Sequence, residues 1–192
     1  MVSATNVDAV AVNTVAWLAS PETSIVVPVY QRQYRWDIGG CEQLLADIRA
    51  VADTSTGSDT MHFIGSILSA ENAHGESGEL VLIDGQQRIT TLMLLVAALH
   101  HTIRATDPVL AQELEQVLLR ATDPSRTKLR PHRAWADVFE RVVRDTHGDD
   151  DARDSRFDDN YAFFRSQVSA DEAPRIWRGL QRLEHVSITL GA

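Results

Sequence analysis

Hydrophobic and polar residues follow two different patterns along the chain, and these patterns predict strands and helices. Short apolar or alternating runs predict strands at residues 25–29, 62–68, 80–83 and 186–190. The run at 80–83 has no polar position, which is typical of a strand buried on both faces. Pro28 places the first strand at a sheet edge or marks its end, and Gly65 indicates a close approach to the backbone of the second.

Apolar positions three and four residues apart predict helices over most of the remaining chain. The stretches with this spacing are 10–18, 41–51, the run from Gln87 onward, 109–120, 131–144, 160–168 and 174–185. Polar or glycine-containing stretches predict loops at 54–60, 71–79 and 148–159. This order of elements predicts an α+β fold, with a small sheet built early and a mainly helical C-terminal part.

We divide the chain into a core, residues 1–105, and a helical portion of the same domain, residues 106–192. The last predicted strand ends just before a terminal Gly-Ala. We therefore expect the sequence to be part of a longer protein.

Composition and charge narrow the classes of function. With 192 residues, 44% hydrophobic and 23% charged, the chain has the balance of a globular protein. Its net charge of −9 excludes DNA binding over a broad basic face, so any DNA contact must use a local positive pocket. Cys41 is the only cysteine, which excludes disulfides, and no apolar run is long enough to span a membrane. We expect a cytoplasmic protein without membrane contact.

The sequence Asp84-Gly85-Gln86-Gln87-Arg88 joins the strand at 80–83 to the long helix. A helix that starts directly after a strand has backbone N–H groups without intrahelical partners and the positive end of its dipole at the turn. Gly85 removes a side chain that would hold an anion away, and Arg88 adds positive charge, so these residues fit a phosphate site. In the alternative interpretation, Asp84 caps the helix and Arg88 is a surface charge. There is no P-loop or Rossmann glycine pattern.

The same residue types also fit phosphate hydrolysis. Phosphoryl transfer needs charge stabilisation, a positioned water and usually a divalent metal. Arg88 fits the first role, and Gln86 or Gln87 fits the second. Asp84 fits a metal ligand or a base that accepts the proton of the water.

Aromatic residues and arginines are interleaved at residues 30–36. In an extended segment one face carries Tyr30, Arg32, Tyr34 and Trp36, and the other carries Gln31, Gln33 and Arg35. Such interleaving suits a base or sugar stacked near a phosphate. The alternative is that Tyr34 and Trp36 fill the core while the arginines contact water.

Residues 84–92 resemble the DGQQR-[LI]-TTL signature of the N-terminal domain of GmrSD-type modification-dependent restriction enzymes. Three more stretches resemble the same family in the same order, at 30–36, 63–68 and 160–164. The resemblance implies a ParB/sulfiredoxin-like mixed sheet and an NTP-binding and NTP-hydrolysing activity, with GTP favoured. It also implies that Asn160 and Tyr161 reach the site, although Tyr161 fits a core position equally well.

Chemistry and resemblance together predict the residues of the site. The predicted catalytic residues are Asp84, Gln86, Gln87 and Arg88. The predicted nucleotide-binding residues are Gly85, Arg88, Thr90, Thr91 and Lys128. Asp84 is also the predicted ligand of Mg²⁺ or another divalent cation that accompanies the NTP. Lys128 lies in a basic run, residues 120–133, which alternatively forms a solvated helix flank pairing with acids such as Asp137 and Glu140.

The resemblance extends to phosphorothioate-sensing Ssp-type effectors, in which a similar domain precedes an HNH nuclease. It implies that modified DNA is recognised by Tyr30, Gln31 and Arg32, with Tyr34 and Arg35 beside them. It also implies that a C-terminal nuclease domain of the same polypeptide cuts the DNA, and we expect no nuclease activity in residues 1–192. A sulfur-substituted phosphate is weakly hydrated, so an apolar wall beside an arginine would favour it.

These inferences predict an NTP-hydrolysing sensor domain of an anti-phage restriction effector. One alternative is a non-catalytic, nucleotide-gated DNA-binding switch of the ParB kind. Another is a protein-interaction domain in which the turn at 84–88 has only a structural role.

Overall fold

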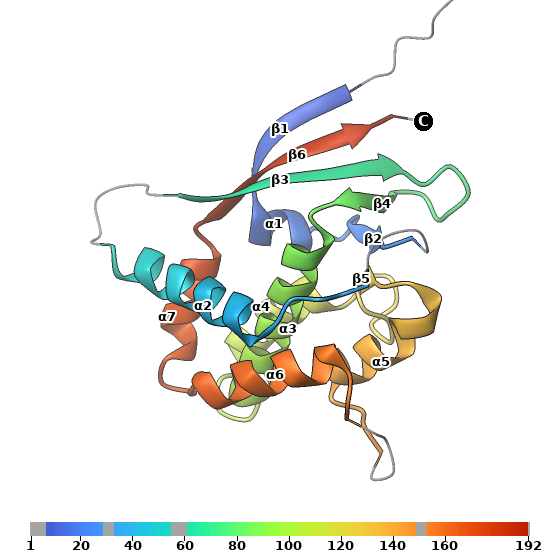
Figure 1. The fold of residues 1–192 in the computed structure, drawn as a ribbon. Helices are drawn as coiled ribbons and strands as arrows, with labels where there is room; N and C mark the ends of the chain where they lie inside the picture. Colours follow the sequence, from blue (N-terminus) through green and yellow to red (C-terminus); the bar gives the residue numbers. More distant parts are fainter. Residues whose placement is uncertain (1–6, 29–32, 55–60, 149–152, 192) are drawn as a thin grey trace, which may run out of the picture.

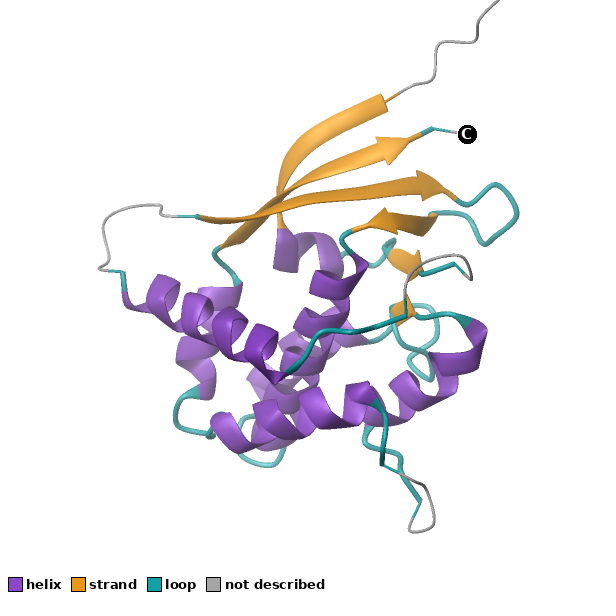
Figure 2. Ribbon diagram, in the orientation of Figure 1, coloured by secondary structure: helices purple, strands orange, loops and turns teal. Residues whose placement is uncertain are grey.

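The structure, a computed structural model, describes residues 7–28, 33–54, 61–148 and 153–191. These residues form two layers, a six-stranded mixed sheet and a group of helices on one of its faces (Figures 1 and 2). The sheet order is β1-β6-β3-β4-β2-β5. The predicted α+β class is therefore confirmed.

The strands are β1 (Val7–Asn13), β2 (Ser24–Val26), β3 (His62–Glu71), β4 (Glu79–Asp84), β5 (Leu129–Arg130) and β6 (Leu183–Leu190). The helices are α1 (Thr14–Ala19), α2 (Ile38–Asp53), α3 (Gln86–Ile103), α4 (Pro108–Leu118), α5 (Arg133–Arg144), α6 (Arg156–Gln167) and α7 (Ala173–Leu180).

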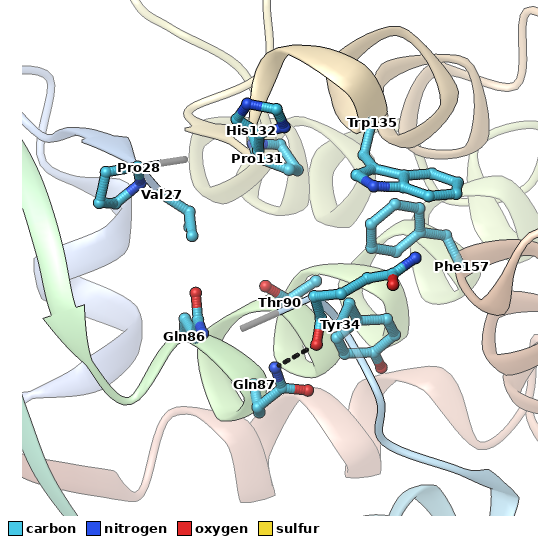
Figure 3. A pocket seen from close by; sticks show the side chains of 11 residues that line it. Val27, Pro28, Tyr34, Gln86, Gln87, Thr90, Pro131, His132, Trp135 and Phe157 are labelled. Carbon is cyan, nitrogen blue, oxygen red and sulfur yellow. Dashed lines mark hydrogen bonds between the residues drawn. The ribbon is translucent and has the colours of Figure 1, made fainter. Parts of the chain in front are cut away.

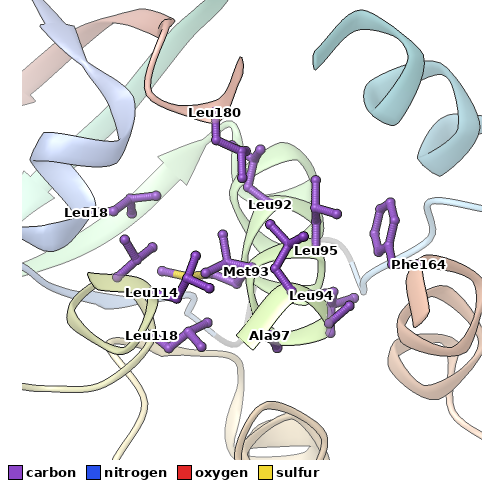
Figure 4. Close-up of a cluster of buried hydrophobic side chains, with 14 of the residues drawn as sticks. Leu18, Leu92, Met93, Leu94, Leu95, Ala97, Leu114, Leu118, Phe164 and Leu180 are labelled. Atoms are coloured by element: carbon purple, nitrogen blue, oxygen red, sulfur yellow. The ribbon is translucent and has the colours of Figure 1, made fainter. Parts of the chain in front are cut away.

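Helix α3 lies at the centre of the helical layer. Every residue from Ile89 to Leu99 is buried, and the surrounding helices α4, α5, α6 and α7 all pack against it. Figure 4 shows its leucines among Leu114 and Leu118 of α4, Phe164 of α6 and Leu180 of α7. A helix that is apolar all round belongs inside a core. This packing fixes the axis of α3 and so fixes where its first turn meets the end of β4.

Strand β4 is less buried than its sequence predicts. Leu82 is fully buried, but Leu80, Val81 and Ile83 are each half-buried. The prediction of burial on both faces is wrong because the helices cover only one face of the sheet (Figure 2).

Both ends of the described chain belong to the sheet. β1 pairs along its whole length with β6 in the antiparallel sense. The helix predicted at 10–18 is therefore wrong up to Asn13, whose side chain accepts a hydrogen bond from Ala16 N at 3.0 Å and caps α1. The helix predicted at 174–185 is wrong at its end, since β6 begins at Leu183. The sheet is thus not built only from the early part of the chain.

Other boundaries differ by a few residues. α6 begins at Arg156, inside the predicted loop 148–159, because Ser155 and Asp158 form a capping box there. β5 has no counterpart in the sequence predictions. β2 lies inside the sheet and ends at Val26, so Pro28 marks the end of a strand and not a sheet edge. Helices at 41–51, 109–120 and 131–144 are confirmed as α2, α4 and α5. None of the helices that the structure describes has the length and apolar character needed to cross a membrane.

Candidate functional site

The turn between β4 and α3 is shaped by Gly85. Its φ of 92° is left-handed, and a Cβ at this position would lie 2.4 Å from Ile67 Cδ1, so only glycine fits. Gly85 is the N-cap residue, and no side chain of the described residues caps the helix. Asp84 does not cap it, because its Oδ1 accepts a hydrogen bond from Gly85 N at 2.8 Å. Among the residues that the structure describes, the first turn of α3 therefore has no side-chain cap.

A cavity of about 430 Å³ lies against this uncapped turn; we call it the turn cavity. Its lining residues are Trp36, Ile83, Asp84, Gly85, Gln86, Gln87 and Arg88. Asp84 is the one carboxylate and Arg88 the one cation among these lining residues. The predicted residues 84–88 thus do line a single cavity.

Arg88 lies over a gap in the neighbouring strand. β3 has one extra residue opposite β6 between Phe63 and Ser66, and Gly65 there has a φ of +106°. A Cβ on Gly65 would lie 2.8 Å from Arg88 Nη1, so the close approach predicted at Gly65 is confirmed and Arg88 is what approaches. The half-buried Arg88 forms no hydrogen bond or ion pair with any residue that the structure describes. Its charge is available to an anion.

The side chain of Gln87 is hydrogen-bonded to residues 33–35, a segment that crosses the start of α3. Its Oε1 accepts a hydrogen bond from Arg35 N at 2.8 Å. Its Nε2 donates to Gln33 O at 3.2 Å, the bond dashed in Figure 3. Thr91 Oγ1 lies 2.7 Å from the Tyr34 hydroxyl and donates to Gln87 O at 2.7 Å. The side chains of Gln87 and Thr91 therefore hold residues 33–35 and do not point freely into the turn cavity.

Asn160 of α6 completes this attachment. Its Nδ2 donates to the Tyr34 hydroxyl at 2.8 Å and to Trp36 O at 2.9 Å. The Tyr34 ring stacks on Phe157 with centroids 5.1 Å apart, and burial raises the pKa of Tyr34 to about 12. Tyr34 and Trp36 pack against the core, as the alternative interpretation predicts, and Arg35 is exposed. Residues Tyr30, Gln31 and Arg32 lie outside the described residues.

A smaller cavity of about 150 Å³ lies on the other side of Gln87 (Figure 3). Gln86 and Thr90 face it from α3, opposite Trp135 and His132 of the α5 region. Both α3 residues are nearly buried, with exposed fractions of 8% and 5%. Gln86 and Gln87 line both cavities, so the first turn of α3 is a wall between them.

Lys128 is not brought to either cavity. It is 1% exposed, and its Nζ donates to Ser20 O at 3.0 Å and to Gln116 O at 2.8 Å. Burial lowers the pKa of Lys128 to about 8. It ties the ends of α1 and α4 together instead of facing the turn.

The neighbouring arginines pair with acids, as the alternative interpretation of the basic run predicts, but their partners are not Asp137 or Glu140, and Arg120 is buried rather than solvated. Arg120 forms an ion pair with Glu76, and Arg130 forms one with Glu79. Their acidic partners lie at and before the start of β4, a pairing that the sequence did not indicate. Tyr161 also lies away from the turn, because its hydroxyl is hydrogen-bonded to His101 Nδ1 at 2.6 Å.

A divalent cation fits the turn only together with a ligand. Among the described residues no group of three or more His, Cys, Asp or Glu side chains could hold a metal ion. Asp84 is a single exposed carboxylate in the turn cavity. Mg²⁺ commonly binds through one or two carboxylates, several waters and substrate phosphates, so Asp84 suits a Mg²⁺–nucleotide complex.

Two comparisons with known proteins bear on the family. A search of curated proteins gives no match. The family model described as GmrSD restriction endonuclease, N-terminal domain, matches residues 16–190, which include all of the residues named at the turn. This match covers nearly the whole chain. The chain therefore belongs to the family of GmrSD restriction endonuclease N-terminal domains.

Proposed function

We propose that this domain binds a nucleoside triphosphate, with GTP favoured, at the turn between β4 and α3 and hydrolyses it. The domain would act as the sensor of a restriction effector that recognises modified DNA, with phosphorothioated DNA favoured. The observation that carries the proposal is Arg88, a half-buried cation without an acidic partner among the described residues, in a cavity at an uncapped helix N-terminus. A polyphosphate supplies the charge that such a cavity lacks.

Different residues of the turn make different contacts with the bound phosphates. Backbone N–H groups of the first turn of α3 and the guanidinium of Arg88 bind phosphate oxygens. Asp84 would hold Mg²⁺ together with the phosphates, and the bound cation would supply further neutralisation of their charge. Because Gly85 has no side chain, phosphate can approach the helix end.

Hydrolysis needs a positioned water and an acceptor for its proton. Gln87 is hydrogen-bonded to the backbone of Gln33 and Arg35, and we assign the water-orienting role to Gln86, whose nearly buried side chain lines the same cavity. Asp84 is the carboxylate in reach of that space and fits the acceptor.

The attachment of Gln87 to the segment at 33–35 supports a link between nucleotide and DNA. In the proposal, Tyr30, Gln31 and Arg32 contact the modified DNA, and the backbone next to them is hydrogen-bonded to the turn. A change in the segment would therefore reach the first turn of α3 through Gln87.

One observation favours the alternative, a nucleotide-gated switch without turnover. Gln87 and Thr91 are both engaged in holding the segment at 33–35, and Asp84 is the one carboxylate lining the turn cavity. Phosphate binding by Arg88 and the backbone N–H groups of α3 needs neither Gln87 nor Thr91, whereas hydrolysis also needs a group that orients water and a group that accepts its proton.

Turnover of each NTP with Mg²⁺ by the purified chain separates these functions. We expect phosphate release by the wild type, and a loss of about 100-fold or more in kcat/KM for Arg88→Ala, because a charge on the transferred phosphate loses its partner. Arg178→Ala, at an exposed position of α7, is the matched control and should keep full activity. Nucleotide binding without turnover would establish the switch, and a folded wild type that does neither would contradict both functions.

DNA sensing is tested separately. The wild type should bind a modified, phosphorothioate-bearing duplex more tightly than the unmodified duplex, measured by fluorescence anisotropy. Tyr30→Ala should lose this difference. Unchanged discrimination by the variant would discard the assignment of the sensing residues.

A further inference from the structure

A second cavity adjoins the turn cavity between α2 and β3. We call it the α2–β3 groove; its volume is about 410 Å³. Trp36 and Arg88 line both the groove and the turn cavity, so the two spaces share a wall. A ligand held by Arg88 at the turn can therefore extend into the groove.

The walls of the groove near Arg88 are aromatic. Trp36 packs against Gly40 of α2, where a Cβ would be 3.2 Å from its ring. Phe63 of β3 is 57% exposed, although aromatic side chains of this size usually bury their area. An exposed aromatic residue beside a cavity is typical of a stacking surface for a flat ligand.

The groove is also lined by hydrogen-bond acceptors. Asp47 of α2 accepts a hydrogen bond from Gln43 Nε2 at 2.8 Å, which leaves its second oxygen and the Gln43 carbonyl for a ligand. No cation among the described residues forms an ion pair with Asp47. A half-buried carboxylate without a cationic partner favours a ligand that offers N–H donors.

Size distinguishes the groove from the space on the opposite side of Gln87. Sites for small organic ligands typically measure about 300–1,000 Å³. The groove, at about 410 Å³, is within this range, and the cavity beside Gln86 and Thr90, at about 150 Å³, is below it. Of the two spaces that adjoin the turn cavity, only the groove has the volume for a nucleoside.

We infer that the α2–β3 groove is the nucleoside subsite, in which a guanine base lies against Trp36 and Phe63 and donates its N–H groups to Asp47 and Gln43. Guanine presents two adjacent donors, N1–H and the 2-amino group, which match the second oxygen of Asp47 and the side-chain carbonyl of Gln43. Adenine presents an acceptor at N1 and would leave Asp47 facing a lone pair. This inference rests on the proposed function, because the phosphates of the same ligand occupy the turn cavity.

The first test separates the base from the phosphates by calorimetry with Mg²⁺ and either GTP or tripolyphosphate. Phe63→Ala should weaken GTP binding about tenfold or more and leave tripolyphosphate binding unchanged, because it removes only a stacking surface. Arg88→Ala should weaken both. Val10→Ala, at another 57% exposed strand position away from the groove, is the matched control and should bind as the wild type does.

The second test compares the binding of GTP, ITP and ATP, which differ in the hydrogen-bond donors of the base. ITP lacks the 2-amino group of GTP. The wild type should prefer GTP to both. Asp47→Asn should reduce the preference for GTP over ATP at least tenfold, without a change in the binding of tripolyphosphate.

The outcomes distinguish a failure of the proposed function from a failure of the nucleoside subsite. If the wild type binds neither GTP nor tripolyphosphate, the proposed function fails. If it binds GTP, but Phe63→Ala binds GTP equally well or Asp47→Asn keeps its discrimination, the nucleoside subsite is overturned and the phosphate site stands.

Discussion

Gln87 is the residue at which the structure changes the chemistry most. From the sequence, its amide is a candidate for orienting an attacking water. In the structure, both ends of the amide are hydrogen-bonded to backbone atoms of Gln33 and Arg35. A side chain that holds two backbone groups at once fixes a segment, so Gln87 positions the segment at 33–35 over α3.

We expect Gln87→Ala to release this segment. Losing two hydrogen bonds costs about 1–2 kcal/mol, and most of the effect should be local. Hydrogen exchange at the Arg35 amide, which donates to Gln87, should accelerate severalfold while the amides of α3 remain protected. Gln167→Ala, whose amide contacts only the exposed Ser166, should leave Arg35 unchanged. Equal protection of Arg35 in both variants would show that other contacts hold the segment.

At the scale of elements, the start of α3 depends on the conformation of one glycine and on the strand beside it. Gly85 adopts a left-handed φ directly after β4, and Ile67 of β3 fills the space where its Cβ would lie. The bulge in β3 at Gly65 makes room for Arg88 on the same side. The two glycines thus position the first turn of α3 and its arginine independently.

Gly85→Ala should destabilise the protein by about 2–4 kcal/mol, because the left-handed conformation and the contact with Ile67 both oppose a Cβ. Chemical denaturation measures this change. Gly39→Ala is the matched control in α2, where the nearest contact of a Cβ is an ordinary 3.4 Å to Asp37, and it should gain about 0.5–1 kcal/mol from helix propensity. A Gly85→Ala variant as stable as the wild type would mean that the turn rearranges easily.

Elements with a regular apolar pattern are predicted from the sequence, whereas strands that depend on a distant partner are not. Helices α2, α4 and α5 have one apolar face each, and that pattern is present in the sequence whatever they pack against. β1 and β5 are strands whose partners, β6 and β2, lie far away in the chain. Their backbone hydrogen bonds decide the structure, and no local pattern encodes those bonds.

At the scale of the whole molecule, the sheet and the helical layer enclose two neutral histidines. His185 of β6 is fully buried, with its Nδ1 2.9 Å from Thr14 Oγ1. Burial lowers the pKa of His185 to about 4, and the positive charge of Arg88 contributes a smaller part. Burial likewise lowers the pKa of His101 to about 4. Both side chains stay neutral in the folded protein where the unfolded chain would protonate them.

This difference predicts a loss of stability in mild acid. Below pH 6.5 the unfolded chain binds protons that the folded chain excludes, so the free energy of unfolding falls as the pH is lowered from 6.5 toward 4. At pH 5 each histidine should account for about 2 kcal/mol of this loss. Urea denaturation at pH 7 and pH 5 measures it.

His185→Gln should lose less stability between these two pH values than the wild type does. His74→Gln, at an exposed position, should lose as much as the wild type. Identical losses in the wild type and in His185→Gln would contradict the assignment of a neutral buried His185.

The sequence by itself determined the α+β class, the strand–turn–helix unit around residues 84–88 and the family to which the signature belongs. These features are local, because a run of apolar residues, a glycine and the start of a helix occupy neighbouring positions. The tertiary structure alone decided that Lys128 lies away from the turn, that Gln87 holds the chain at 33–35, and that Arg88 lies over Gly65 without an acidic partner among the described residues. Those outcomes depend on which distant side chains pack together, and packing is a property of the folded core rather than of any stretch of sequence.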